Sequence, residues 1–204
     1  MAYALIPAAG RSERMGESKP MMPFGESTIL GCLIESLQSG GATRVLVVRS
    51  PADRTLGNWC VDHEIEAAIN PKPDDGMLST VQIGVEALGG SDTFASSNLP
   101  LLVSPADHPA IQPTTVRRLL DRVSEGRRLA VPSFRGRRGH PLAIGSDLIA
   151  SIPALDPTIG LRQLLSRHAD RLQEVDVDDE GVLLDLDTPE EYQRALQHMS
   201  GHRG

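Results

Sequence analysis

The sequence predicts a Rossmann-like, doubly wound α/β fold with a mostly parallel sheet, in one domain spanning residues 1–204. Short apolar runs alternate with segments of helical spacing along the chain, which is typical of parallel strands joined by crossover helices. A glycine-containing loop follows the first apolar run, where such folds place ligands. The length of 204 residues also fits a single domain.

The first half of the chain gives the alternation in order. Ala2–Ile6 is an apolar run that predicts a buried strand ending at Pro7. Thr28 is placed to cap a helix that Gly40 and Gly41 end. The next predicted elements are the strand Val45–Val48, a short helix or turn Pro51–Trp59, the strand Ile65–Ile69, the polar loop Asn70–Leu78 and the helix Ser79–Leu88.

The second half continues the pattern. The Gly/Ser-rich stretch Gly89–Asn98 is expected to form a surface turn. Thr188, followed by Pro189 and two glutamates, predicts the cap and first turn of a last helix that ends near Met199. The other predicted elements are the strands Leu99–Val103, Leu129–Pro132, Leu142–Ile144, Leu172–Val177 and Val182–Leu186, and the helices Pro113–Arg122, Ser146–Ile152 and Gly160–His168.

Composition excludes several functional classes. A net charge of −7 and an aromatic content of 3% argue against binding to nucleic acid. No apolar run approaches about 18 residues, and no leader pattern is present, so we expect neither membrane spanning nor secretion. Cys32 and Cys60 have no metal-binding or disulfide-framework spacing, which fits the cytoplasm.

The loop within Ile6–Gly25 is the first candidate site. Gly10 and neighbouring small residues let the backbone approach an anion, and Arg11, Arg14 and Lys19 are side chains that hold phosphate oxygens. Lys19 is one of only two lysines in the chain. The spacing matches neither a dinucleotide glycine fingerprint nor a P-loop. Nucleoside triphosphate binding and a tight turn with solvated charges both remain open at this point.

Two aspartates form the second candidate site. Asp107 and Asp187 each follow an apolar run, so each could lie at the carboxyl end of a strand near the loop, where two carboxylates can hold Mg²⁺. Each has a structural alternative: Asp107 could start a turn before Pro109, and Asp187 could cap the last helix. Asp185 competes for the metal role.

Two further segments carry polar groups. Ser79 stands where it could cap a helix, and a free helix N-terminus also suits an anion. Arg135, Arg137 and Arg138 occupy a predicted hairpin tip. These arginines fit a solvated tip and attraction of an anionic acceptor equally well.

The stretch PAAGRSERMGESKPMMPFGESTIL resembles the signature of the MobA-like nucleotidyltransferases, and within them it is most similar to the molybdopterin cytidylyltransferases. This resemblance implies a fold of the nucleotide-diphospho-sugar transferase type. It implies that Arg14 and Lys19 contact the triphosphate. It also implies that the loop holds the nucleotide through Pro7, Ala8, Ala9, Gly10, Arg11 and Ser12.

Four later segments extend the resemblance as far as Tyr192. PADHPAI and LLDLDTPEEY are similar to the family segments that name Asp107 and Asp187 as magnesium ligands. NPKPDDGMLSTVQIG, with Gly76 and Ser79, is similar to the segment that lines the nucleoside pocket. GHP, with His140, and GLRQLLS, with Arg162, resemble elements near the acceptor. Pro105–Ala106 and His108, on either side of Asp107, depart from the family pattern.

The resemblance implies Mg²⁺-dependent transfer of CMP from CTP to the phosphate of a molybdopterin-type pterin, with Lys19, Arg14 and Asp107 as catalytic residues and a molybdoenzyme as a possible partner. Ala9 stands where guanylyl-transferring relatives usually have glycine, which favours a pyrimidine base. Three alternatives stay open: a guanylyltransferase, a sugar- or alditol-phosphate nucleotidyltransferase, and a non-catalytic cofactor carrier.

Overall fold

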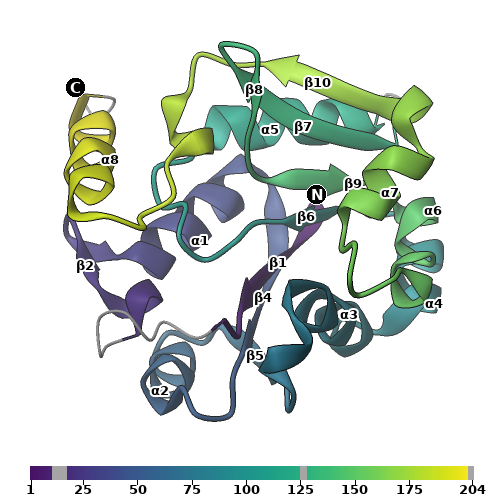
Figure 1. Cartoon of the computed structure of the whole chain (residues 1–204), viewed down its shortest axis with the longest axis horizontal. Coiled ribbons are helices and arrows are strands. Elements are labelled where there is room, and N and C mark those ends of the chain that lie inside the picture. The colour runs from purple at the N-terminus through teal and green to yellow at the C-terminus, as the bar shows by residue number, and fades with distance from the viewer. Residues whose placement is uncertain (11–17, 125–127, 202–204) are drawn as a thin grey trace.

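A central eight-stranded sheet organises the chain in the computed structural model, which describes residues 1–10, 18–124 and 128–201 (Figure 1). The strands lie in the order β10–β7–β9–β6–β1–β4–β5, and β8 pairs with β7. Only the pairs made by β8 and β9 are antiparallel, so the expected mostly parallel sheet is confirmed. The strands are β1 (Ala2–Ala8), β4 (Ala42–Arg49), β5 (Glu66–Ile69), β6 (Leu101–Val103), β7 (Leu129–Phe134), β8 (Arg137–Arg138), β9 (Leu142–Ile144) and β10 (Leu172–Asp176).

Strand β1 is longer than the sequence predicted. It was expected to end at Pro7, but it pairs with β4 as far as Ala8. Its pairing with β6 stops earlier, where Leu5 lies opposite Val103. Pro7 therefore has a ladder neighbour on one side only, where its missing N–H is tolerated.

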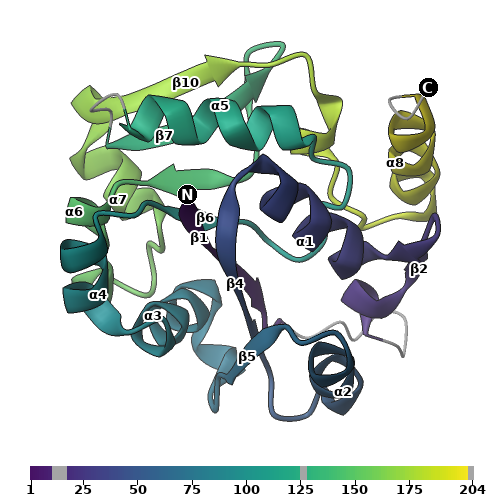
Figure 2. The same ribbon diagram turned by 180° about the vertical axis from the view of Figure 1, so that it is seen from behind.

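Helices cover both faces of the sheet (Figures 1 and 2). Alternate residues of β1 point to opposite faces, so Ile6 packs in the cluster with α1, α2 and α5, and Leu5 packs in the cluster with α3, α4, α6 and α7. The helices are α1 (Ile29–Gly40), α2 (Arg54–Asp62), α3 (Met77–Ala87), α4 (Gly90–Ser97), α5 (Pro113–Ser124), α6 (Ser146–Ile149), α7 (Arg162–Arg167) and α8 (Pro189–Gly201). None of the helices in the described ranges is long and apolar enough to cross a membrane.

A smaller third cluster lies beside the sheet. The two-stranded hairpin of β2 (Pro23–Phe24) and β3 (Ser27–Thr28) packs with α8 around Phe24. The rings of Phe24 and Tyr192 meet edge to face with centroids 5.7 Å apart. This cluster joins the segment after the glycine loop to the C-terminal helix.

Three expectations about local structure are wrong. Gly89–Asn98 contains the helix α4, which packs Phe94 edge-on against Tyr3 with centroids 5.3 Å apart. Val182–Leu186 is not a strand: its first two residues belong to a 3-10 turn, Glu180–Leu183, which Asp179 fixes by accepting a hydrogen bond from Gly181 N. Helix α3 begins at Met77 rather than at Ser79.

Gly76 is the N-cap of α3, and its φ of 91° favours glycine. The expected Ser79 cap is therefore wrong, and the Ser79 hydroxyl instead donates to Gly76 O at 2.8 Å. Two other caps are confirmed. Thr28 Oγ1 accepts from Gly31 N in α1, and Thr188 Oγ1 accepts from Glu191 N in α8.

The topology places a ligand position at one edge of the sheet. The chain runs from β1 to β4 and β5 on one side and then returns to β6 on the other side of β1. In doubly wound sheets, ligands bind at such a switch point, outside the carboxyl ends of the strands. Here that position lies between the segment after Ala8 and the segment after Val103.

Candidate functional site

Lys19 joins the two aspartates that the sequence singled out. Its ammonium Nζ lies 3.1 Å from Asp107 Oδ2 and 2.8 Å from Asp187 Oδ1. The Lys19 side chain is 16% exposed, whereas Asp107 is 29% and Asp187 62% exposed. Three segments far apart in the sequence therefore place one positive and two negative groups at the carboxyl edge of the sheet.

Local hydrogen bonds hold Lys19 in place. Lys19 opens a 3-10 turn, Lys19–Met21, and Ser18 just before it donates to Asp53 Oδ2 at 2.7 Å. Asp53 also caps α2, because its Oδ1 accepts from Leu56 N at 3.0 Å. The end of the glycine loop is thereby tied to α2. The sequence pattern did not indicate this role for Asp53, although an aspartate before a helix is a recognisable cap.

Asp187 is left available because its neighbour caps the helix. Thr188 Oγ1 accepts from Glu191 N at 3.2 Å, and the Glu191 carboxylate accepts from Thr188 N at 2.8 Å. This reciprocal capping box needs no contribution from Asp187. Of the two nearby candidates, Asp187 contacts Lys19, whereas the Asp185 side chain makes no hydrogen bond or ion pair with this cluster among the described residues.

Asp107 stays ionised over the ordinary pH range. Burial alone would raise the pKa of its carboxyl, but a hydrogen bond and charge from His108, together with the Lys19 ammonium, outweigh burial and lower the pKa well below its usual value. Burial lowers the pKa of Lys19, while the bonds to Asp187 and Asp107 more than offset that effect and raise it. Asp107 and Lys19 are therefore both charged at neutral pH.

The residues present fit a divalent cation. The carboxylates of Asp107 and Asp187 converge on a single positive centre, the Lys19 ammonium, which shows that both can face one cation. Within the described ranges, no cluster of three or more His, Cys, Asp or Glu side chains could hold a metal by itself. Mg²⁺ is usually bound by one or two carboxylates, and phosphate oxygens and water fill its other coordination positions. Asp107 and Asp187 match this set of ligands.

The glycine loop is described only in part. Pro7 and Ala8 end β1, Ala9 follows and is 2% exposed, and Gly10 is exposed with open space around it. Arg11, Ser12 and Arg14 lie outside the described residues. The backbone segment expected to hold the nucleotide therefore begins at the carboxyl end of β1, beside the Lys19 cluster.

Hydrogen bonds of the buried residue Asn70 hold the segment after β5 in place. Asn70 is 1% exposed, and its amide donates to Ser79 Oγ at 3.1 Å and Thr80 Oγ1 at 3.0 Å. Asn70 Oδ1 accepts from Lys72 N at 2.9 Å. These bonds tie the loop to the first turn of α3 and leave Gly76 exposed at the start of the helix.

The two expected acceptor residues differ in position. His140 is half-buried, and its ring meets the His108 ring edge to face with centroids 4.7 Å apart, so it lies one residue removed from Asp107. Burial, with the neighbouring His108, lowers the pKa of His140 to about 4. Arg162 is exposed at the start of α7, and among the described residues it makes no hydrogen bond or ion pair with Lys19, Asp107 or Asp187.

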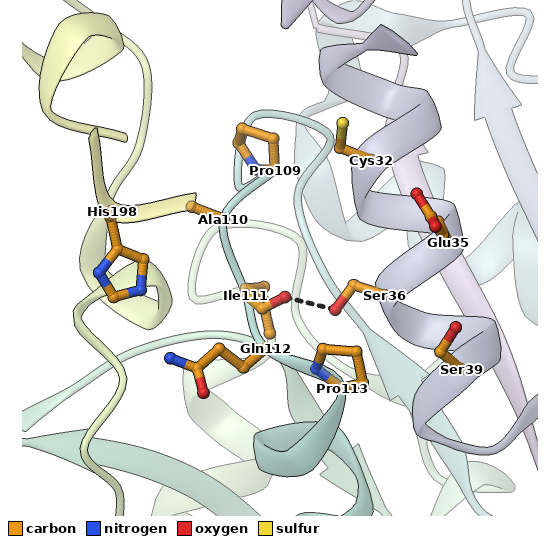
Figure 3. A pocket seen from close by; sticks show the side chains of 10 residues that line it. All are labelled: Cys32, Glu35, Ser36, Ser39, Pro109, Ala110, Ile111, Gln112, Pro113 and His198. Carbon is orange, nitrogen blue, oxygen red and sulfur yellow. Dashed lines mark hydrogen bonds between the residues drawn. The ribbon is translucent and has the colours of Figure 1, made fainter. Parts of the chain in front are cut away.

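A cavity of about 240 Å³ lies behind the Asp107 loop, between that loop, α1 and α8 (Figure 3). It contains none of the site residues that the sequence predicted. Figure 3 shows the Ser36 hydroxyl of α1 bonded to the Ile111 carbonyl oxygen across its floor. The chain that follows Asp107 is thus anchored to α1.

Comparisons with known proteins identify the family of the chain. The family model described as the MobA-like NTP transferase domain matches residues 4–172. The molybdenum cofactor cytidylyltransferase of Escherichia coli (strain K12) is 24% identical over 190 residues, which are 92% of each chain.

Solved structures share the fold. A nucleotidyl transferase from Methanothermobacter thermautotroptrophicus superposes with a TM-score of 0.79 at 23% identity and covers 98% of each chain. Rv0371c of Mycobacterium tuberculosis H37Rv, in complex with manganese, gives a TM-score of 0.71 at 20% identity and covers 96% of this chain and 98% of its own.

Proposed function

Because the chain belongs to the MobA-like NTP transferase family and is a nucleotidyltransferase, we propose that it transfers CMP from CTP to the phosphate of a molybdopterin-type cofactor and releases pyrophosphate. The observation that carries this proposal is the meeting of Lys19, Asp107 and Asp187 at the switch point of the sheet. Carboxylates that could hold a cation, next to a lysine, suit transfer from a triphosphate, because that reaction depends on neutralising phosphate charge.

The reaction joins two phosphates. An acceptor phosphate oxygen attacks the α-phosphorus of CTP, the bond from that phosphorus to the β-phosphate oxygen breaks, and pyrophosphate leaves with the bonding electrons. The attacking phosphate already carries negative charge, so no side chain has to remove a proton. Catalysis then consists of alignment and charge neutralisation.

The chain's own residues divide this work. Lys19 offers an ammonium to the phosphate oxygens once it leaves the carboxylates, and Arg14 is proposed to share that role. Asp107 and Asp187 would hold Mg²⁺, which would supply positive charge to neutralise the charge that develops on the phosphate oxygens. The manganese in the Rv0371c complex supports a divalent cation in this fold.

Binding of the two substrates is assigned to the flanking segments. Pro7 to Ser12 and the Gly76–Ser79 start of α3 would hold the nucleotide. The described part of the first segment continues from the carboxyl end of β1, and the second segment follows the carboxyl end of β5. His140 would face the acceptor from beside Asp107, and Arg162 is proposed to meet the acceptor phosphate. The choice of CTP is supported by the cytidylyltransferase relative and by Ala9 in place of glycine.

The proposal is tested by measuring pyrophosphate release with CTP, GTP, UTP or ATP, each offered with molybdopterin and Mg²⁺. We expect CTP to be the preferred nucleotide and the Asp107→Ala variant to be inactive although folded. Preference for GTP would assign a guanylyltransferase, and turnover with a sugar or alditol phosphate but not the pterin would replace the acceptor. Pterin binding without any pyrophosphate release would favour a cofactor carrier that serves a molybdoenzyme.

A further inference from the structure

His108 follows Asp107 directly and is turned inward. It is 6% exposed, and its ring atom Nδ1 lies 2.9 Å from Asp107 Oδ1. A carboxylate oxygen accepts, so the ring donates through a proton on Nδ1. His108 is therefore buried and donates a hydrogen bond to a candidate metal ligand, which a histidine that only packs in the core would not do.

The two oxygens of Asp107 consequently have different partners. His108 holds Oδ1, whereas Oδ2 faces Lys19 Nζ at 3.1 Å. With Oδ1 engaged, rotation of the carboxylate about its Cβ–Cγ bond would break the bond to the ring. The arrangement leaves one defined oxygen turned toward the point where Asp187 also converges.

His108 is itself held from two sides. The His140 ring packs edge-on against it at 75° with centroids 4.7 Å apart, and His140 N donates to Val182 O at 2.9 Å. A Cβ on Gly139 would collide with the same Val182 carbonyl group, so the two segments lie in direct contact. On the other side, the Ser36–Ile111 hydrogen bond anchors the chain beyond His108 (Figure 3).

We propose that His108 is a positioning residue: its Nδ1–H fixes the Asp107 carboxylate so that Oδ2 alone is presented to the divalent cation, and the His140 ring keeps His108 in that orientation. This inference rests on the proposed function, because it assumes that Asp107 holds the cation. Hydrogen-bonded partners behind a metal ligand usually change metal affinity or activity by about 10- to 100-fold when removed.

Two variants separate the donor from the ring. His108→Asn keeps an N–H at about the position of Nδ1 but lacks the ring, and His108→Phe keeps a ring of similar shape without the donor. We expect His108→Asn to bind Mn²⁺ within about 3-fold of wild type, and His108→Phe to bind it about 10- to 100-fold more weakly. His63→Asn is the matched control, since His63 is an exposed histidine that stacks on Trp59 away from the site.

The readouts are Mn²⁺ binding to the nucleotide-free protein, followed by calorimetry or electron paramagnetic resonance, and the KM for the metal–nucleotide complex against kcat. In the metal-free wild type, nitrogen-15 NMR should show His108 with its proton on Nδ1 and a hydrogen-bonded proton signal that disappears in Asp107→Ala. If His108→Phe does not fold, this NMR signature and the affinity of His108→Asn decide the question.

Equal metal affinity in His108→Phe and wild type, or a His108 ring protonated only on Nε2, would overturn the inference. So would a loss in His108→Asn as large as that in His108→Phe, because the ring and not the donor would then matter. Failure of the proposed function has a different signature: wild type itself would bind no Mn²⁺ at this site and release no pyrophosphate.

Discussion

Replacing Lys19 with methionine should produce two opposite effects. The variant Lys19→Met keeps a long side chain but removes the ammonium that lies between Asp107 and Asp187. Transfer activity should fall sharply, because the triphosphate loses a positive partner. Affinity for Mn²⁺ without nucleotide should rise, because the ammonium and the metal ion compete for the same two carboxylates.

The size of the second effect follows from the geometry. At 2.8 and 3.1 Å and an effective dielectric constant of about 20, each pair has a gross attraction of about 5 to 6 kcal/mol. Asp187 is 62% exposed, so its share approaches that of a surface pair, about 0 to 1 kcal/mol. Desolvation of the 16% exposed Lys19 offsets much of the remainder. A net of about 1 to 2 kcal/mol corresponds to Mn²⁺ binding about 5- to 30-fold tighter.

The assay is titration of nucleotide-free protein with Mn²⁺ at pH 7.5 and low salt, alongside pyrophosphate release with CTP. Lys72→Met is the control for metal binding, since Lys72 is the only other lysine and its side chain is exposed. Unchanged or weaker Mn²⁺ binding by a folded Lys19→Met protein would refute the reasoning, because the ammonium and the cation would then occupy different places.

Three further outcomes are expected. Asp187→Asn should weaken Mn²⁺ binding and transfer about 10- to 100-fold, whereas Asp185→Asn should change either by less than about 3-fold in the same titration. Asp179→Ala should lower the free energy of unfolding by about 3 kcal/mol in urea, since Asp179 is 1% exposed and accepts from Gln112 N, Thr115 Oγ1 and Gly181 N. The pKa of His140 is lowered from 6.5 to about 4 in the folded protein, so between these values the unfolded chain binds a proton and the folded protein does not. The free energy of unfolding of wild type should therefore fall by about 2 kcal/mol from this residue between pH 7.5 and 5. The His140→Phe variant should not show that decrease.

The spacing of apolar residues, together with Gly, Pro and capping residues, predicted most helices and strands, because these features depend on residues close together in the sequence. The caps at Thr28 and Thr188 were found from the sequence since their partners lie three residues away. The stretch Gly89–Asn98 was missed because one buried aromatic, Phe94, makes it a helix by packing on Tyr3, and a single apolar residue has no period. Val182–Leu186 was missed because a buried apolar run fits a strand or a turn equally well.

Strand-end reasoning correctly placed Asp107 after β6, but Asp187 follows the 3-10 turn Glu180–Leu183 and not the strand on which its placement was based. The shared contact of both aspartates with Lys19 was not predicted. That contact joins residues 88 and 168 positions apart, and no local pattern encodes such pairings. Asp179 was missed for a related reason. It stabilises the fold because it is buried and accepts hydrogen bonds from residues distant in the sequence, and no sequence pattern indicates this. The hydrogen bond from His108 to Asp107 joins neighbouring residues. The sequence does not predict it, because it forms only if the His108 ring points inward and not into solvent.

The position of Asp187 depends on packing outside the sheet. Asp187 lies just before α8, and α8 is held by Phe24, whose ring meets Tyr192, and by the hydrogen bond from the Tyr192 hydroxyl to the Pro23 carbonyl oxygen. Pro23 and Phe24 belong to the hairpin that directly follows the Lys19 turn. One apolar cluster therefore sets the distance between the lysine and the second carboxylate. Asp107, in contrast, lies in the segment that follows β6 of the central sheet, so the site combines one partner positioned by the sheet with two positioned by the apolar cluster around Phe24.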